Sequence, residues 1–196
     1  MNFLAHLYLS GNDEQLMIGN FIADSVKGSL FKNYPEGIAK GIKLHRAIDF
    51  FSDNHPVFLK SVERLRPNYR KYAGVIVDIF YDHFLAKNWN EYSEISLEEY
   101  AGKVYSLMLK NILQMPNKAI MFLKYAIRTN VLVSYETLDG IGEVLHGMSR
   151  RTIFKSNMEF SITDLKENYP LFENEFELFF VDLKKFAKEW KSTAHL

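Results

Sequence analysis

The segment at residues 77–89, VDIFYDHFLAKNW, most constrains how this chain can fold. It belongs to an expected helix over residues 73–88 whose apolar side chains cover the whole circumference, a pattern typical of a helix at the centre of a core. Asp78, Asp82 and His83 interrupt this apolar surface. At about 100° per residue, the two aspartates lie one above the other and His83 lies beside them. An uncompensated buried carboxylate is costly, so these side chains must be paired, neutralised or bound to a metal ion.

The rest of the chain also favours helices. Asn12 and Ser96 look like helix N-caps, because Gln15 and Glu99 follow them by three residues. The expected helices cover residues 13–27, 35 to about 51, 56 to just before Pro67, 73–88, a segment after Ser96, 117 to about 129, 134–146, and a segment after Pro170. No alternating strand pattern, internal repeat or low-complexity linker is present. We therefore expect an all-α protein with a single domain, residues 1–196, folded as a helical bundle.

Composition limits the possible functions. The formal net charge is zero, so no overall field indicates a nucleic acid or a membrane as partner. The chain has no cysteine, which excludes disulfides, thiolate catalysis and cysteine-ligated metal sites. Any metal ion must therefore be held by histidine, aspartate, glutamate or carbonyl groups. No apolar run reaches the ~18 residues of a membrane span, and no signal peptide is recognisable, so we expect a cytoplasmic protein.

A second polar pair lies on the expected helix over residues 35–51. With Ile38 at 0°, the ~100° rule places Ile42 near 40°, His45 near −20° and Asp49 near 20°. His45 and Asp49 therefore lie in the middle of an apolar face, where charge is least expected. The pattern predicts either a buried structural ion pair or two ligands of a site.

These buried polar side chains, together with His6 and Asp24, suit a metal centre. Oxygen and imidazole ligands without thiolate suit Mn²⁺, Mg²⁺, Fe²⁺ or zinc, and such a cation can activate water and polarise a phosphoryl oxygen. The alternative is purely structural: His6 would be a hydrogen-bonded core residue, and Asp24 would form a surface ion pair with Lys27. Asp78 and Asp82 are hardest to explain in that way, because two carboxylates on one buried face repel each other unless a cation lies between them.

Five motifs carry a resemblance to a known family: MNFLAHLYLS at 1–10, GNFIADSVKG at 19–28, GIKLHRAIDFFSDNHP at 41–56, VDIFYDHFLAKNW at 77–89 and MSRRT at 148–152. In this order they resemble the acyl carrier protein phosphodiesterases, regarded as an atypical branch of the HD-type metal-dependent phosphohydrolases. The resemblance covers the chain from end to end. It implies an HD-domain-like bundle and a manganese-dependent hydrolase, with Mg²⁺ or Fe²⁺ as other possible metals. Such an enzyme removes 4′-phosphopantetheine from holo-acyl carrier protein and leaves the serine hydroxyl free.

The resemblance also implies roles for single residues. HD enzymes use a His, an adjacent His-Asp pair and a distant Asp, whereas Asp82-His83 has the reverse order here. The expected metal ligands are Asp24, His45, Asp82 and His83, with His6 in second rank. The expected catalytic groups are Asp49 and Asp78 as proton acceptors, and Lys27 and Arg46 as cations that offset phosphate charge. A basic surface for the acidic carrier protein is expected from Arg64, Arg66, Arg70, Arg150 and Arg151.

Two other functions stay open at this stage. One is an HD-type phosphohydrolase that acts on a nucleotide or another small phosphoester, which would need an enclosed pocket rather than an open basic surface. The other is a non-enzymatic helical binding module, in which the buried polar groups only pair with one another. Neither a nucleic acid nor a membrane is expected as a partner, and the sequence does not predict the oligomeric state.

Overall fold

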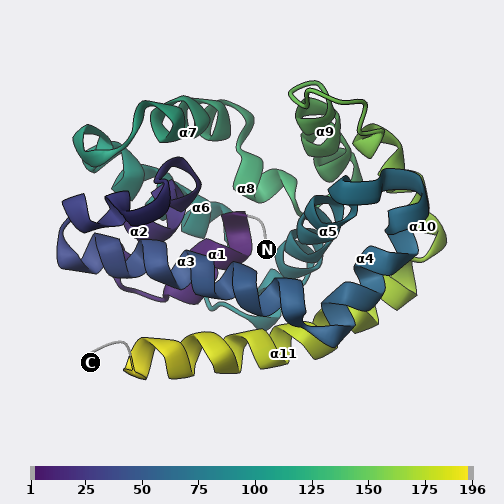
Figure 1. Cartoon of the computed structure of the whole chain (residues 1–196), viewed down its shortest axis with the longest axis horizontal. Helices are drawn as coiled ribbons and strands as arrows, with labels where there is room; N and C mark the ends of the chain where they lie inside the picture. The colour runs from purple at the N-terminus through teal and green to yellow at the C-terminus, as the bar shows by residue number, and fades with distance from the viewer. Residues whose placement is uncertain (1–2, 194–196) are drawn as a thin grey trace.

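The protein is described by a computed structural model covering residues 3–193 (Figure 1). Met1 and Asn2, the first two residues of the MNFLAHLYLS motif, lie outside that range. Residues 3–193 form α-helices and short 3-10 helices, and none of them lies in a strand. The α-helices are α1 (Phe3–Ser10), α2 (Glu14–Ile22), α3 (Glu36–Asn54), α4 (Pro56–Tyr69), α5 (Ala73–Lys87), α6 (Leu97–Lys110), α7 (Asn117–Thr129), α8 (Val131–Ser134), α9 (Leu138–Ser149), α10 (Ser161–Glu167) and α11 (Tyr169–Thr193). The expectation of an all-α bundle is confirmed.

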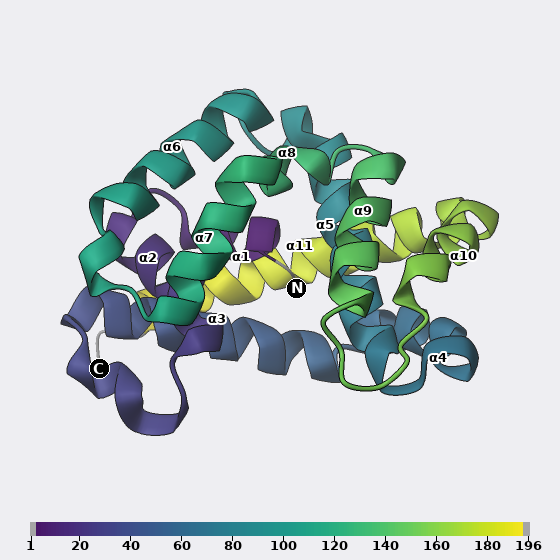
Figure 2. The same cartoon turned by 90° about the horizontal axis from the view of Figure 1, so that it is seen from above.

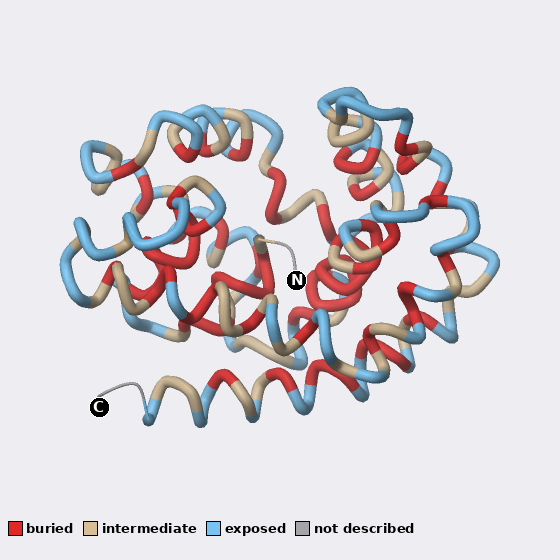
Figure 3. Tube along the Cα trace, in the orientation of Figure 1, coloured by how far each residue is buried: buried red, intermediate tan, exposed pale blue. Residues whose placement is uncertain are grey.

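Helix α5 lies at the centre of the bundle, as its apolar circumference predicts. It contacts α1, α4, α9 and α11, and Figure 3 shows it buried along most of its length. Its large apolar residues with no exposed surface are Ile76, Val77, Ile79, Phe80, Tyr81, Phe84 and Leu85. The helix expected over residues 73–88 is therefore confirmed to within one residue.

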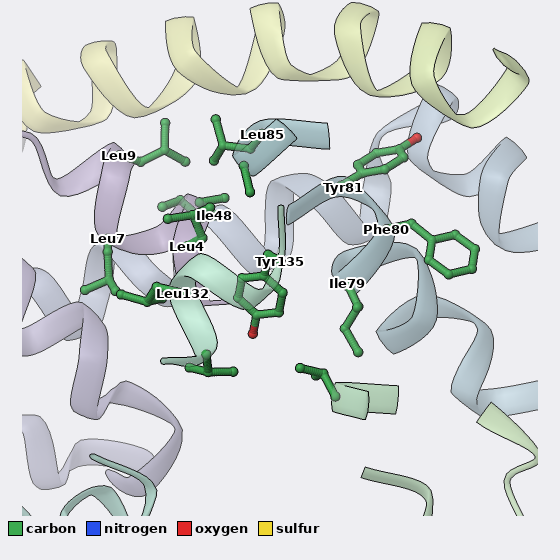
Figure 4. Packing of buried hydrophobic residues seen from close by; sticks show 14 of the residues in the cluster. Leu4, Leu7, Leu9, Ile48, Ile79, Phe80, Tyr81, Leu85, Leu132 and Tyr135 are labelled. Atoms are coloured by element: carbon green, nitrogen blue, oxygen red, sulfur yellow. The ribbon is translucent and has the colours of Figure 1, made fainter. Parts of the chain in front are cut away.

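Helix α11 runs along one side of the molecule and covers α3, α4 and α5 (Figure 1). Its buried stripe consists of Phe172, Glu175, Phe176, Phe179, Phe180, Leu183 and Ala187. Figure 4 shows Leu9, Tyr81 and Leu85 on the side of the core that faces this helix. Pro170 occupies the first turn of α11, where a missing N–H costs no intrahelical hydrogen bond.

Two glycines let α2 and α3 approach closely. A Cβ atom on Gly19 would lie 2.1 Å from the carbonyl oxygen of Ile38, and one on Gly41 would lie 2.3 Å from that of Leu16. Neither distance is sterically possible, so only glycine permits this helix contact. The close packing brings the polar side chains of α2 and its C-terminal extension against those of α3.

Some predicted helix boundaries are wrong for local reasons. The cap of α2 is Asp13 rather than Asn12, because the Asp13 carboxylate accepts the Leu16 N–H at 3.0 Å. That helix ends at Ile22 and continues as the 3-10 helix η1 (Ala23–Ser25) instead of running to residue 27. The predicted cap of α6 is confirmed, since Ser96 accepts the Glu99 N–H.

Two later boundaries also differ. Helix α4 passes through Pro67 and ends at Tyr69, because the proline lies on the exposed side of the last turn, where water can bind the carbonyl left without a partner. The helix expected over residues 134–146 is interrupted after α8. A new helix, α9, begins behind Thr137, whose hydroxyl accepts the Gly140 N–H at 3.0 Å. Among residues 3–193, no helix is long and apolar enough to cross a membrane.

Candidate functional site

Four ionisable side chains meet where α1, η1 and α3 come together; we call His6, Asp24, His45 and Asp49 the histidine–aspartate cluster. His6 Nε2 lies 3.1 Å from Asp49 Oδ1. His45 Nε2 lies 3.3 Å from Asp49 Oδ2 and 3.4 Å from Asp24 Oδ1. The two imidazole rings are stacked, with centroids 3.9 Å apart and 15° between their planes. Ligand atoms of His6, His45 and Asp49 all lie within 4.8 Å of one another, a spacing that allows one metal ion to contact all three.

The cluster has a buried side and an open side. Ile38, Ile42 and His45 are buried on one face of α3, as the helical periodicity predicts, and Asp49 continues that face. The side chains of His6 and His45 are 3% and 7% exposed, whereas those of Asp49 and Asp24 are 42% and 62% exposed. The imidazoles therefore form the floor, and the carboxylates border the solvent, from which a substrate would approach.

Asn20 sets the orientation of the His45 ring. Its Nδ2 donates to the carbonyl oxygen of His6 and to Ser10 Oγ, both at 3.0 Å. Its Oδ1 must therefore face His45 Nδ1, 3.1 Å away, and accept the proton of that nitrogen. His45 Nε2 is thereby directed at the two carboxylates, the arrangement typical of a metal-binding histidine. Asn20 precedes Asp24 by four residues, so helical spacing puts both on one side of the chain, but the sequence does not predict a role for Asn20.

The cluster carries excess negative charge. Burial lowers the pKa of His6 to about 4, so this ring is neutral at pH 7. Burial alone would also lower the pKa of His45, but hydrogen bonds to Asp24 and Asp49 raise it to about 9. The hydrogen bond with His45 lowers the pKa of Asp24, and bonds to both histidines lower the pKa of Asp49 against the opposing effect of burial. Two carboxylates thus face a single positive ring, and a cation would be stabilised between them.

Asp82, an expected metal ligand, lies elsewhere. It is fully buried, and its carboxylate accepts the backbone N–H groups of Leu4 at 2.8 Å and Ala5 at 3.2 Å. These groups belong to the first turn of α1, so Asp82 anchors the helix that carries His6. Burial raises the pKa of Asp82 to about 7. A bound cation between Asp78 and Asp82 is therefore not needed to explain the buried carboxylate, since helix N–H groups and a raised pKa compensate it.

His83, the second ligand expected on α5, is also engaged outside the cluster. Its Nδ1 donates to the carbonyl oxygen of Tyr135 at 2.8 Å, which leaves Nε2 to accept the Tyr169 hydroxyl at 2.8 Å. Burial lowers the pKa of His83, in keeping with a neutral ring that bridges α5, the α8–α9 connection and α11. Neither tyrosine is near His83 in sequence, so no local pattern predicts these contacts. The structure does not bring Asp82 or His83 into the group of side chains around His45.

The other expected catalytic residues differ in position. Burial raises the pKa of Asp78, and the charge of Asp49 adds to this rise. Arg46 donates to the carbonyl oxygens of Val26 and Gly28 at 2.7 and 2.8 Å. It therefore holds the loop that follows Asp24, rather than pointing at a phosphate position. Lys27 lies exposed in that loop.

One of the five arginines expected to bind a partner is engaged within the bundle, and the other four are exposed. Arg64 donates through both terminal nitrogens to Glu175, at 2.7 Å each, and is engaged within the bundle. Arg66 is exposed on α4, and exposed Arg70 begins the 3-10 helix η3 (Arg70–Tyr72). Exposed Arg150 and Arg151 follow α9.

A cavity of about 970 Å³ opens beside the cluster and has Asp24 in its wall. Most of its lining is apolar or aromatic and comes from α1, α2, η1, α5, α7, α8 and α9. Figures 1 and 2 show α7 and α9 standing apart on the side of the molecule opposite α11. Arg150, Arg151 and Lys118 are the cationic side chains of its lining.

Comparisons with known proteins identify the family of this chain. The family model described as acyl carrier protein phosphodiesterase matches residues 1–183. The chain belongs to this family. A relative with the same name in Photorhabdus laumondii is 32% identical, over 92% of this chain and 91% of its own length. Another in Enterobacter sp. strain 638 is also 32% identical, over 96% of this chain and 98% of its own length. An Escherichia coli O6:H1 relative is also 32% identical, over 92% of this chain and 94% of its own. No solved structure gives a significant match. The expected family assignment is confirmed.

Proposed function

We propose that this protein hydrolyses the phosphodiester bond that joins 4′-phosphopantetheine to a serine of holo-acyl carrier protein. Water adds to phosphorus, the bond between phosphorus and the serine oxygen breaks, and the serine oxygen takes up a proton. The products are apo-carrier protein and free 4′-phosphopantetheine. Family membership and the activity for which the relatives are named support this reaction. The observation that carries it is the histidine–aspartate cluster, with its two carboxylates open to solvent.

The donor set of the cluster fits a divalent cation such as Mn²⁺, Mg²⁺ or Fe²⁺. Two imidazoles and two carboxylates converge without thiolate, and the two carboxylates exceed the single charge of His45. In this proposal His6, His45, Asp24 and Asp49 hold the ion. In the metal-free protein, the proton on His45 supplies positive charge to the two carboxylates instead. When bound, such an ion supplies Lewis acidity toward a phosphoryl oxygen and lowers the pKa of water.

The chain's own residues prepare the reaction. Asn20 keeps Nε2 of His45 directed into the site through its bond to Nδ1. Asp82 fixes the start of α1 and so fixes the position of His6. Arg46 holds the loop that follows Asp24. Asp78, with its raised pKa, is our candidate for the group that accepts the proton of the attacking water.

A second candidate is hydrolysis of a nucleotide or another small phosphoester. The observation that favours it is the cavity beside Asp24, which is large enough for a small molecule. The engagement of Arg64 with Glu175 also removes one of the five expected arginines from a docking surface. Both candidates use the same cluster and differ only in the substrate.

Mass spectrometry of holo-acyl carrier protein separates these candidates. The carrier is incubated with the protein and Mn²⁺, and a matched sample contains EDTA. We expect the phosphopantetheine mass to be lost only in the sample with metal. A parallel panel of nucleotides tests the second candidate. If the carrier stayed intact while a nucleotide was hydrolysed rapidly, the substrate would be the nucleotide and not the carrier. Equal cleavage of the carrier in the presence of EDTA would overturn the metal-dependent mechanism.

A further inference from the structure

We infer that the cavity beside the cluster binds the 4′-phosphopantetheine arm of the carrier protein, an inference that rests on the proposed function. Asp24 belongs both to the cluster, where it lies 3.4 Å from His45, and to the wall of the cavity. A phosphate held at the cluster therefore has the cavity directly beside it. The arm and the carrier serine are attached to different oxygens of that phosphate, so the arm leaves the phosphate in another direction than the serine.

The part of the lining near Asp24 has the apolar character that this arm requires. Phe21 precedes Asp24 by three residues, and its ring lies 5.7 Å from that of Phe122. Phe3 stacks on Phe122, with ring centroids 4.0 Å apart. These three aromatic rings, contributed by α1, α2 and α7, form a continuous apolar wall. The gem-dimethyl and methylene groups of pantetheine would lose contact with water against such a wall.

The lining also contains polar groups that suit the rest of the arm. Tyr72, Tyr125 and Thr152 are among the lining residues. The Tyr72 and Thr152 hydroxyls already donate to backbone carbonyl oxygens, so toward pantetheine they can accept a hydrogen bond from an amide N–H. The Arg151 guanidinium lies 5.3 Å from the centre of the Tyr125 ring, so it connects the α9 side of the cavity to the α7 side. Together with Lys118 and Arg150, it makes this side of the site attractive to a phosphate and to an acidic carrier.

The size of the cavity agrees with an occupant of this length. Its volume of about 970 Å³ lies at the upper end of the roughly 300–1,000 Å³ of sites that enclose a small molecule. Hydrolysis at the cluster alone would need no such space. A nucleotide is the competing occupant, because its base could stack on the same aromatic wall.

Gly147 offers a way to fill the cavity without straining the backbone. It lies in α9, and a Cβ atom there would be 3.6 Å from the Tyr125 hydroxyl and 3.8 Å from Arg151 Nη2, which are ordinary contact distances to two lining residues. Gly147→Leu therefore directs a side chain toward the cavity. Gly142→Leu is the matched control, because Gly142 lies in the same helix and its Cβ would meet nothing within 4 Å.

The experiment is a calorimetric titration of 4′-phosphopantetheine, inorganic phosphate and AMP into the wild-type protein and both variants, with Mn²⁺ present. We expect the wild type to bind 4′-phosphopantetheine at least about tenfold more tightly than phosphate, a difference of about 1.4 kcal/mol. Gly147→Leu should lose this advantage and keep its affinity for phosphate, and Gly142→Leu should behave like the wild type. Equal affinities in the wild type, or a preference for AMP over 4′-phosphopantetheine, would overturn the inference.

A second variant protects the test against misfolding. Met121 also lines the cavity, but its side chain is 73% exposed, so Met121→Trp narrows the space without disturbing the core. It should reduce the advantage of 4′-phosphopantetheine over phosphate in the same direction. If both Gly147→Leu and Met121→Trp keep the wild-type ratio, the arm does not bind there.

The outcomes for the inference and for the proposed function are separable. If the wild-type protein releases the arm from holo-carrier but binds 4′-phosphopantetheine no better than phosphate, the function stands and the cavity inference fails. If the carrier survives intact while the affinity advantage exists and disappears in Gly147→Leu, the cavity inference stands and the proposed reaction fails.

Discussion

Two buried polar groups in this bundle differ in how their charge is compensated. The Glu175 network consists of Glu175, Arg64, Ser61 and Tyr81, and the histidine–aspartate cluster lies apart from it. In the network, Arg64 donates to both oxygens of Glu175, and Ser61 donates to Glu175 Oε2 and hydrogen-bonds Tyr81. The Glu175 carboxylate thus meets the Arg64 guanidinium and, at 3.3 Å, the exposed Lys60 ammonium, so its charge is fully compensated by cations.

The cluster lacks that compensation. Asp24 and Asp49 both face the same nitrogen of His45, and the second ring, His6, is neutral because burial lowers its pKa. A fully compensated network needs nothing further to be stable, whereas excess carboxylate around an imidazole nitrogen is stabilised by a bound cation. The comparison indicates that the Glu175 network holds α4, α5 and α11 together, and it supports our proposal that the cluster is the functional site. Four predictions test this distinction.

The largest effect is expected from Asp49→Ala. This change removes the carboxylate that contacts both imidazoles, so hydrolysis of holo-carrier should fall by at least about 100-fold and metal content should drop. Mass spectrometry of the carrier and elemental analysis of the purified protein measure the two effects. Asp53→Ala, an exposed aspartate one turn further along α3, is the control. Near wild-type turnover in Asp49→Ala would remove the cluster from the mechanism.

Glu175→Ala should affect stability instead of chemistry. Removing one partner of a buried pair leaves the other uncompensated, and Arg64 is only partly exposed, so we expect a loss of about 3 kcal/mol in unfolding free energy. Urea denaturation measures this loss. Glu173→Ala on the same helix is the matched control: its pair with Lys87 is more exposed, and its loss should stay below about 1 kcal/mol. A folded Glu175→Ala protein with greatly reduced kcat would contradict the structural assignment.

The stability of the chelator-treated protein should decrease as pH rises above 6.5. The pKa of His45 is raised from 6.5 to about 9, so between these values the folded state binds more protons than the unfolded state. The stabilisation is complete below pH 6.5 and is lost as pH rises through about 9, with at most about 2 kcal/mol lost from pH 6.5 to 8. Denaturation curves across this range measure the slope. His45→Gln should remove most of it, and an unchanged slope in that variant would assign the titration to another group.

The smallest effect concerns the carrier surface. Arg150 is exposed beside the cavity, so Arg150→Ala should raise the KM for holo-carrier by at most about fivefold, more at low salt than at high salt. Arg64 is engaged with Glu175, so Arg64→Ala should reduce stability and leave KM unchanged. Steady-state kinetics at two ionic strengths test both. If Arg64→Ala raised the KM more than Arg150→Ala did, Arg64 would belong to the docking surface.

Local chemistry explains which parts of the fold were predictable. Three predicted features depend only on side chains within one or two helical turns: the apolar circumference of α5, the Ser96 cap, and the buried face of α3 that carries His45. All three are confirmed. The errors arose where neighbouring signals compete. Asp13 rather than Asn12 caps α2, and the Thr137 cap begins a new helix inside a segment that reads as one continuous helix.

The sequence by itself determined the family, the all-α fold and the short list of polar side chains that must be compensated in the core. Only the tertiary structure decided which of them meet. His45 and Asp49 are predictable partners because one helix carries both, whereas His6 joins them through the packing of α1 on α3. Asp82 and His83 were candidates for the same reason as His45, but the long-range contacts to α1, Tyr135 and Tyr169 compensate them separately. Helical periodicity predicts which face is buried, and the packing between helices decides what that face contacts.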